Sequence, residues 1–206
     1  MIKAILFDMD GVLIDAKDWH YEALNKALAH FGYNISRDNH LSTYDGLPTR
    51  DKLKMLTKIH GLPSGLHSFI NQLKQLYTIE YCNNHCKPTF NHQYCLSKLK
   101  NDGYKIAVCS NSIRSSIIAM MDKSNLTQYL DLILSNQDVK DGKPSPEIYT
   151  KAMSILEVDP SECLILEDNE HGIAAANASG GHLMKINIPD DVRYKSIASK
   201  INSISR

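Results

Sequence analysis

The sequence of 206 residues has no excess charge of either sign, since 23 lysine and arginine residues balance 23 aspartate and glutamate residues. A neutral chain has no electrostatic attraction for nucleic acid or for an anionic membrane surface, so we expect neither as a partner. No apolar run approaches the roughly 18 residues that a membrane-spanning helix needs. Residues 1–6 contain one lysine and an apolar stretch typical of a strand, unlike a secretory signal peptide. We therefore expect a cytoplasmic protein.

Cysteine, proline and glycine are also scarce, with five, seven and ten residues respectively. An odd number of cysteines cannot pair completely within one chain, so we expect free thiols. The low glycine and proline contents exclude collagen-like and low-complexity chains, whereas 43% hydrophobic and 22% charged residues are typical of a globular protein. A folded chain of this size buries about 70% of its unfolded surface, which allows one sizeable core.

Short apolar runs alternate with helical patterns over most of the chain. The predicted strands cover residues 2–7, 104–109, 130–134, 163–166 and 182–186. Helices are predicted at residues 112–123, 146–157 and 172–179, and a closing helix carries Ile197, Ile201 and Ile204. Strands that are nearly all apolar and alternate with helices indicate a parallel sheet covered on both faces. The predicted fold class is a doubly wound α/β fold.

Residues 16–85 show no comparable strands. Apolar side chains recur there at helical spacing between Trp19 and Gly32, and again between residues 66 and 81. A further helix is predicted at residues 49–60, with Thr49 as a possible cap and Gly61 as its stop. We expect an α/β core domain built from residues 1–15 and 86–206, and a helical domain of residues 16–85 inserted after the first strand.

Polar side chains follow the ends of three predicted strands and occupy one loop. They are Asp8 and Asp10, Ser110 and Asn111, Glu167 and Asp168, and Lys143 in the loop. Parallel strands place their carboxyl ends at one edge of the sheet, where ligands bind. Clustered carboxylates repel one another unless a cation lies among them, and their oxygen atoms suit Mg²⁺. A hydroxyl and an ammonium could neutralise phosphoryl oxygens, while an aspartate attacks phosphorus to form an aspartyl phosphate.

Four segments in the same order carry a resemblance to a known family. They are residues 7–15 (FDMDGVLID), 109–112 (CSNS), 142–149 (GKPSPEIY) and 166–173 (LEDNEHGI). Together they resemble the four motifs of the haloacid dehalogenase superfamily. The helical insert resembles the cap of the β-phosphoglucomutase and phosphonatase-like branch, and residues 46–50 (GLPTR) resemble the substrate loop of that cap.

The resemblance implies a role for each motif residue in the core. Asp8 would be the nucleophile and a Mg²⁺ ligand. Asp10 would protonate the leaving group and later activate water, while its backbone carbonyl binds Mg²⁺. Ser110 and Lys143 would hold the phosphoryl oxygens, and Lys143 would also offset the charge of Asp8.

The fourth motif completes the implied metal site. Asp168 would bind Mg²⁺, with Glu167 as a further ligand or as a support for one. Asn169 stands where the family commonly has a serine. This departure would change the waters around the metal but leaves both carboxylates in place.

Substrate contacts are expected chiefly from the helical insert. The candidates are His20, Thr49, Arg50 and Asn111. The alternative for His20 is a half-buried position on a helix face, and the alternative for Arg50 is a surface pair with Asp51 or Glu22. An arginine offers a fork of donors that suits a phosphate or carboxylate group. For Lys74, a solvated helix face is the favoured interpretation.

Cysteine and histidine side chains gather between the two predicted domains. The cluster consists of Cys82, His85, Cys86, His92 and Cys95. These residue types can bind zinc, but the spacing does not match a usual finger or ribbon. Because residues from 92 onward also have a helical pattern, we favour buried thiols that pack in the core.

The sequence thus predicts a Mg²⁺-dependent phosphatase that acts on a small phosphorylated metabolite, such as a sugar or polyol phosphate, as a monomer or weak homodimer. Dehalogenation is disfavoured because that chemistry needs neither Asp10 nor the acidic pair. A phosphomutase is the alternative, since it uses the same residues and Arg114 lies close to a basic position of the mutase branch. A phospho-accepting regulatory domain is shorter, lacks the cap and has no acid equivalent to Asp10.

Overall fold

The computed structural model describes residues 1–44 and 47–204, and the chain divides into two compact units. One unit consists of Met1–Asp15 and Cys86–Arg206, and the other of Ala16–His85. The second unit is therefore an insertion in the chain of the first, shortly after the first strand.

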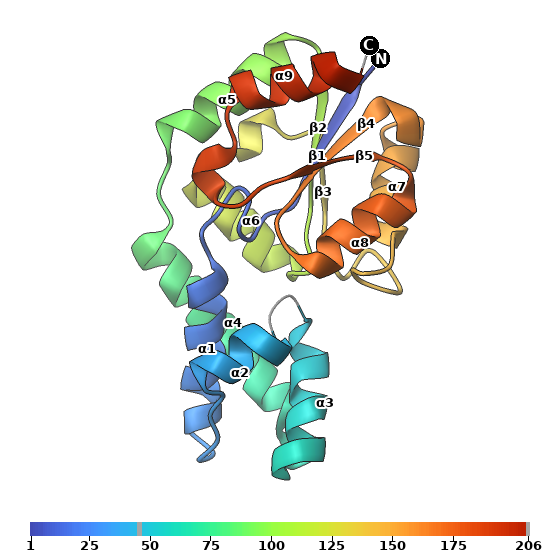
Figure 1. Ribbon diagram of the computed structural model, residues 1–206. Helices are drawn as coiled ribbons and strands as arrows, with labels where there is room; N and C mark the ends of the chain where they lie inside the picture. Colours follow the sequence, from blue (N-terminus) through green and yellow to red (C-terminus); the bar gives the residue numbers. More distant parts are fainter. Residues whose placement is uncertain (45–46, 205–206) are drawn as a thin grey trace. The chain divides into compact units, whose positions relative to one another are not determined.

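A five-stranded parallel sheet forms the centre of the first unit, in the order β3-β2-β1-β4-β5 (Figure 1). The strands are β1 (Ala4–Phe7), β2 (Lys105–Cys109), β3 (Leu132–Leu134), β4 (Cys163–Glu167) and β5 (His182–Lys185). In the central register, Leu6 of β1 lies between Ala107 of β2 and Ile165 of β4. Every residue of β1 and β4 is buried, as expected for strands that are covered on both faces.

Helices cover both faces of this sheet (Figure 1). The helices are α5 (Phe90–Asn101), α6 (Arg114–Lys123), α7 (Glu147–Ile155), α8 (Glu170–Ser179) and α9 (Tyr194–Ile204). Alternate strand residues, such as Leu6 and Cys109, form one buried cluster with Tyr149 and Met153 of α7. Helices α5 and α9 pack together, with the rings of Tyr94 and Tyr194 in contact. The predicted doubly wound α/β fold is confirmed.

Helix α8 begins two residues earlier than the sequence pattern predicts. Asn169 is its N-cap, and the side-chain Oδ1 accepts a hydrogen bond from the backbone N–H of Gly172 at 3.0 Å. This bond satisfies one of the donors that a helix leaves free at its first turn. The cap also fixes the chain directly after the acidic pair that ends β4.

The second unit is entirely helical in its described part. Its elements are α1 (Lys17–Ala29), α2 (Arg37–Asn39), a π-helical turn (His40–Tyr44), α3 (Thr49–His60), a 3₁₀ turn (Ser64–Leu66) and α4 (His67–His85). Helix α3 ends at Gly61 as expected, in a left-handed conformation with φ of 71° that favours glycine. The prediction of Thr49 as a cap is wrong, because Thr49 is already helical and Pro48 precedes it without a side-chain cap bond. Gly46 lies outside the described residues.

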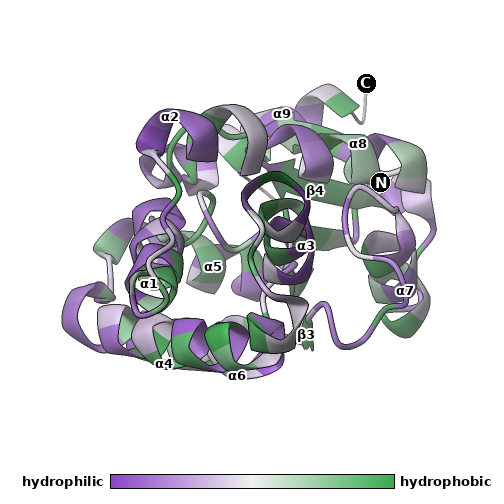
Figure 2. Ribbon diagram, turned by 90° about the horizontal axis from the view of Figure 1, so that it is seen from below, coloured by the Kyte–Doolittle hydropathy of each residue, from purple (hydrophilic) through white to green (hydrophobic). Residues whose placement is uncertain are grey.

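Helices α1 and α4 pack closely on one another and bury a stripe of α4. The buried residues of α4 recur at every fourth position, as Ile70, Lys74, Thr78 and Cys82. The expectation of a solvated Lys74 is therefore wrong: its position falls on the buried stripe, where an aliphatic stem can pack. In Figure 2 the short helix α2 is purple, in agreement with its three hydrophilic residues.

All five cysteines are buried, and no disulfide joins any two of them, as the odd number of cysteines led us to expect. The imidazole Nε2 of His92 lies 2.9 Å from the carbonyl oxygen of Pro189. Burial raises the pKa of the Cys95 thiol to about 12, as it does for Cys109 and Cys163, so these thiols stay neutral and pack as small apolar groups. Among the helices that the structure describes, none is long and apolar enough to span a bilayer.

The loop after β3 is held against α6 by one carboxylate. Both side-chain oxygens of Asp138 accept hydrogen bonds from Nη2 of Arg114, at 2.7 and 2.8 Å. Oδ2 of Asp138 also accepts from the backbone and hydroxyl of Ser135. Burial by itself raises the pKa of Asp138. The hydrogen bonds from Ser135 and the charge of Arg114 outweigh this effect and lower the pKa to about 2. The guanidinium of Arg114 is thus part of a structural ion pair.

Replacing this carboxylate is expected to remove an acid-sensitive part of the stability. A carboxyl group whose pKa is lower in the folded than in the unfolded chain stabilises the native state at pH values above its unfolded pKa. For Asp138 this stabilisation is lost as the pH falls from about 4 to about 2. Asp138→Asn should lower the free energy of unfolding at pH 7 by about 2 kcal/mol and flatten its pH dependence below pH 4. Urea unfolding at several pH values measures both, with the exposed Glu157→Gln as control. An unchanged acid limb in Asp138→Asn would contradict this account.

Candidate active site

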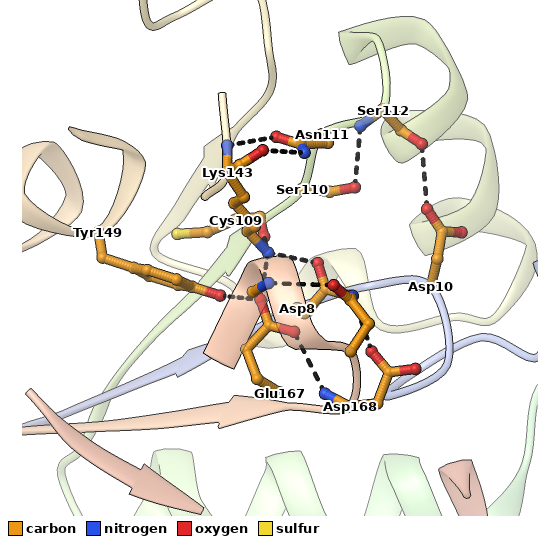
Figure 3. A network of polar contacts seen from close by, with 12 residues as sticks. Asp8, Asp10, Cys109, Ser110, Asn111, Ser112, Lys143, Tyr149, Glu167 and Asp168 are labelled. Atoms are coloured by element: carbon orange, nitrogen blue, oxygen red, sulfur yellow. Dashed lines mark hydrogen bonds and ion pairs between the residues drawn. The ribbon is translucent and has the colours of Figure 1, made fainter. Parts of the chain in front are cut away.

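The carboxyl edge of the sheet gathers the core residues that the sequence analysis singled out (Figure 3). Asp8 directly follows β1, Glu167 is the last residue of β4, and Lys143 lies in the loop between β3 and α7. All three residues are buried, with at most 4% of each exposed. The backbone N–H of Asp8 donates to the carbonyl of Leu166, which ties the end of β1 to the end of β4.

Lys143 is the centre of this arrangement. Its Nζ donates to Oδ1 of Asp8 at 2.6 Å, to Oε1 of Glu167 at 2.6 Å and to the backbone carbonyl of Cys109 at 2.8 Å. The three protons of the ammonium therefore have three acceptors, which an ammonium needs when it is buried. Burial lowers the pKa of Lys143, but the charges of Asp8 and Glu167 more than offset this and raise it, so the side chain stays cationic.

Ser110 and Asn111 follow β2 and face the same site. The backbone N–H of Ser112 donates to Oγ of Ser110 at 3.0 Å, so the Ser110 proton is available to a further acceptor. The side-chain amide of Asn111 binds the backbone of Lys143 at both its N–H and its carbonyl, at 3.0 and 3.2 Å. Asn111 therefore fixes the Lys143 loop in this structure, which is a different contact from the expected one to substrate.

Asp10 points away from the other carboxylates, toward the start of α6 (Figure 3). Its Oδ2 accepts a hydrogen bond from the hydroxyl of Ser112 at 3.0 Å. The carboxylates of Asp8 and Asp10 thus have different surroundings, one bound to an ammonium and the other to a hydroxyl. Two carboxyl groups that act differently in one reaction need different surroundings, because the surroundings set the proton affinity of each group.

Three carboxylates lie close enough to share one ion. In the described parts of the chain, oxygens of Asp8, Glu167 and Asp168 all lie within 4.8 Å of one another. Burial raises the pKa of Asp8 well above its usual value; Lys143 opposes this shift, and Glu167, Asp10 and Asp168 add to it. The negative charge of the cluster therefore exceeds what the single lysine balances. An all-oxygen donor set with excess negative charge fits a hard divalent cation such as Mg²⁺.

The residues of the fourth motif hold this cluster in place. Nδ2 of Asn169 donates to Oδ1 of Asp168 at 3.2 Å, so the residue that departs from the family pattern supports a carboxylate. Gly172 leaves room for Glu167, because a Cβ added at Gly172 would lie 2.0 Å from the Glu167 carboxylate. Glycine is thus required at position 172 because the Glu167 side chain approaches the backbone of α8 closely.

Tyr149 and Ser112 are two further residues at this site, and both lie inside the motifs, although the sequence pattern did not indicate a role for either. The Tyr149 hydroxyl donates to Oε1 of Glu167. Burial, together with the negative charges of Glu167 and Asp8, raises the pKa of Tyr149, so the hydroxyl keeps its proton. The sequence pattern could have indicated that Tyr149 lies near the site, because Tyr149 is in the first turn of the helix that follows Lys143.

Three of the candidate substrate-binding residues, His20, Thr49 and Arg50, belong to the helical unit. Nδ1 of His20 lies 3.2 Å from Nζ of the buried Lys74. Nε of Arg50 lies 3.5 Å from Oδ1 of Asp51, and the Arg50 side chain is 75% exposed. Thr49 begins α3. For Arg50 the structure thus shows the surface pair that the sequence analysis weighed as the alternative.

These observations define the protein as an α/β protein with a buried aspartate–lysine pair and an acidic cluster at the carboxyl edge of its parallel sheet. The sequence profile of the haloacid dehalogenase-like hydrolases matches residues 5–186. The chain belongs to this family of enzymes.

Relatives of the chain carry phosphatase names. A phosphorylated carbohydrates phosphatase from Thermotoga maritima is 27% identical over 182 residues, which cover 87% of this chain and 82% of that protein. A phosphoglycolate phosphatase from Aquifex aeolicus is 30% identical over the same shares of the two chains. A crystal structure of β-phosphoglucomutase from Clostridium difficile has a TM-score of 0.85 at 23% identity, and both chains are covered completely. This last likeness concerns the fold.

Filling the space beside Glu167 is expected to disturb the site. Gly172→Ala should lower the free energy of unfolding by about 1–3 kcal/mol, because the new methyl group overlaps the Glu167 carboxylate. Gly65→Ala is the matched control, since a Cβ at Gly65 meets nothing within 4 Å. Urea unfolding compares the two variants. Equal free energies of unfolding in the two variants would show that Glu167 does not require glycine at position 172.

Proposed function

We propose that the protein is a Mg²⁺-dependent phosphatase that hydrolyses a small phosphorylated metabolite, such as a sugar or polyol phosphate, through an aspartyl phosphate on Asp8. The observation that carries the proposal is the buried contact of Asp8 with Lys143 beside an acidic cluster. The names of the relatives from Thermotoga maritima and Aquifex aeolicus support phosphate monoesters of small carbon compounds as substrates.

The chemistry proceeds in two steps on this chain's own residues. An oxygen of Asp8 attacks phosphorus, the bond to the leaving oxygen breaks, and Asp10 gives its proton to that oxygen. Asp10, now a carboxylate, then takes a proton from a water molecule that attacks the phosphorus of the aspartyl phosphate. Inorganic phosphate leaves, and Asp8 is restored as a carboxylate.

Fixed charges and donors stabilise the transferring phosphoryl group. Lys143 neutralises Asp8 before attack and remains close to the developing charge, while the Ser110 hydroxyl donates to a phosphoryl oxygen. Mg²⁺ held by Asp8, Asp168 and Glu167, with the Asp10 backbone carbonyl, would add positive charge beside the phosphoryl oxygens. Because these groups are already in place, little reorganisation is needed at the moment of reaction.

We further propose that residues 1–15 and 86–206 are the catalytic core and that residues 16–85 are a cap that selects the substrate. The support is the position of the insertion in the chain, a few residues after Asp8 and Asp10. In this proposal His20, Thr49 and Arg50 contact the part of the substrate that is not transferred. A mutase receives no support from Arg114, whose guanidinium is bound to Asp138.

Phosphate release from a panel of small phosphate esters tests the activity. Release should require Mg²⁺, stop with EDTA and fall by on the order of 10³-fold or more in Asp8→Asn, because the nucleophile is removed. Isomerisation of a hexose phosphate in the presence of a bisphosphate primer, without phosphate release, would favour the mutase. Release that survives both EDTA and Asp8→Asn would contradict the proposed chemistry.

The Ser110 hydroxyl gives a second, finer prediction. Ser110→Ala should lower kcat by about 10²-fold, because a donor to the transferring phosphoryl group is lost. Ser203→Ala is the control, because the exposed Ser203 hydroxyl donates to the Lys200 carbonyl within α9. Steady-state kinetics on the best ester of the panel measures both. Equal kcat values in the two variants would remove Ser110 from the mechanism.

A further inference from the structure

Tyr149 contacts both members of the buried ion pair between Lys143 and Glu167. It lies fully buried in α7, and its hydroxyl donates to Oε1 of Glu167 at 2.5 Å. The centroid of its ring lies 5.0 Å from Nζ of Lys143, within the range of a cation–π interaction. The Tyr149 hydroxyl points at the Glu167 carboxylate (Figure 3), while its ring lies within cation–π range of the Lys143 ammonium.

The Glu167 carboxylate is held by donors at both of its oxygens. Oε1 accepts from Nζ of Lys143 and from the hydroxyl of Tyr149, whereas Oε2 accepts from the backbone N–H of Asp168 at 3.2 Å. On another side the carboxylate lies against the backbone of Gly172. A buried carboxylate with its oxygens bound in this way has one orientation, and the oxygen that faces Lys143 is fixed.

The position of the Lys143 ammonium depends in turn on Glu167. Two of the three acceptors of Nζ are the Cys109 carbonyl and Oδ1 of Asp8. The third acceptor is Oε1 of Glu167, the atom to which Tyr149 also donates. If Oε1 lost its second donor, the Glu167 carboxylate would keep its contacts with Lys143, Asp168 and Gly172 but lose one of the bonds that orient it, so the ammonium bound to Oε1 would be held less firmly against Asp8.

We propose that Tyr149 is a positioning residue, whose hydroxyl orients Glu167 so that Lys143 is held against Asp8. The structural part of this proposal concerns the chain alone. Its kinetic consequence rests on the proposed phosphatase function: a displaced ammonium stabilises the transition state less well but changes substrate binding little.

Tyr149→Phe tests the structural part, because it removes the hydroxyl and keeps the ring. Nitrogen-15 NMR of the lysine ammonium groups reports on Lys143, whose three bonded protons should exchange slowly with water. The Lys143 signal is assigned by its absence in Lys143→Arg. In Tyr149→Phe we expect this signal to shift or broaden, although the variant melts close to the wild-type temperature.

Steady-state kinetics on the same variant tests the consequence. We expect kcat to fall about 10-fold, as is typical when a partner of a site residue is removed, and KM to stay within about 2-fold. Tyr194→Phe is the matched control, because Tyr194 donates to the carboxylate of Asp102 at 2.7 Å on the surface. The control should leave both kcat and the Lys143 signal unchanged.

The outcomes separate the two levels of the proposal. An unmoved Lys143 signal in Tyr149→Phe overturns the positioning role, whatever happens to the rate. A moved signal with an unchanged kcat overturns the kinetic consequence. A moved signal in a protein that hydrolyses no ester of the panel supports the structural role of Tyr149 and contradicts the proposed phosphatase.

Discussion

The buried ammonium of Lys143 ties together the ends of three neighbouring strands of the sheet. It binds the last residue of β2, the residue after β1 and the last residue of β4. Removing one member of a buried ion pair generally costs about 3–5 kcal/mol, because the remaining charge is left without its partner. The same contact therefore secures the carboxyl edge of the sheet and places a positive charge beside the proposed nucleophile.

A second constraint comes from negative charge at this edge. Asp8, Glu167 and Asp168 are brought together by strand order, since β1 and β4 are adjacent and parallel. One lysine does not balance three carboxylates in a buried place, and a divalent cation in the proposed site would offset this excess of negative charge. Fold and chemistry are thus coupled: the sheet order that buries the strands also concentrates the charge.

Much of this edge could be predicted from the sequence. The short apolar runs located all five strands, and parallel strands must place Asp8, Ser110 and Glu167 at one edge. The sequence places Tyr149 in the first turn of the helix that follows Lys143, but its contact with Glu167 could not be predicted, because the contact depends on how deeply α7 packs against the sheet. The buried position of Lys74 was missed for a similar reason: periodicity shows that a helix has two faces, but the partner helix decides which face is covered.

The central claim is that Asp8 carries the phosphoryl group during turnover. Acid quenching during steady-state hydrolysis, followed by borohydride reduction and mass spectrometry of the peptides, tests this most directly. We expect Asp8 to be reduced to homoserine, because an aspartyl phosphate is an activated acyl group, and Asp10 and Asp168 to remain unchanged. Reduction at another carboxylate, or turnover without any reducible aspartate, would contradict the account.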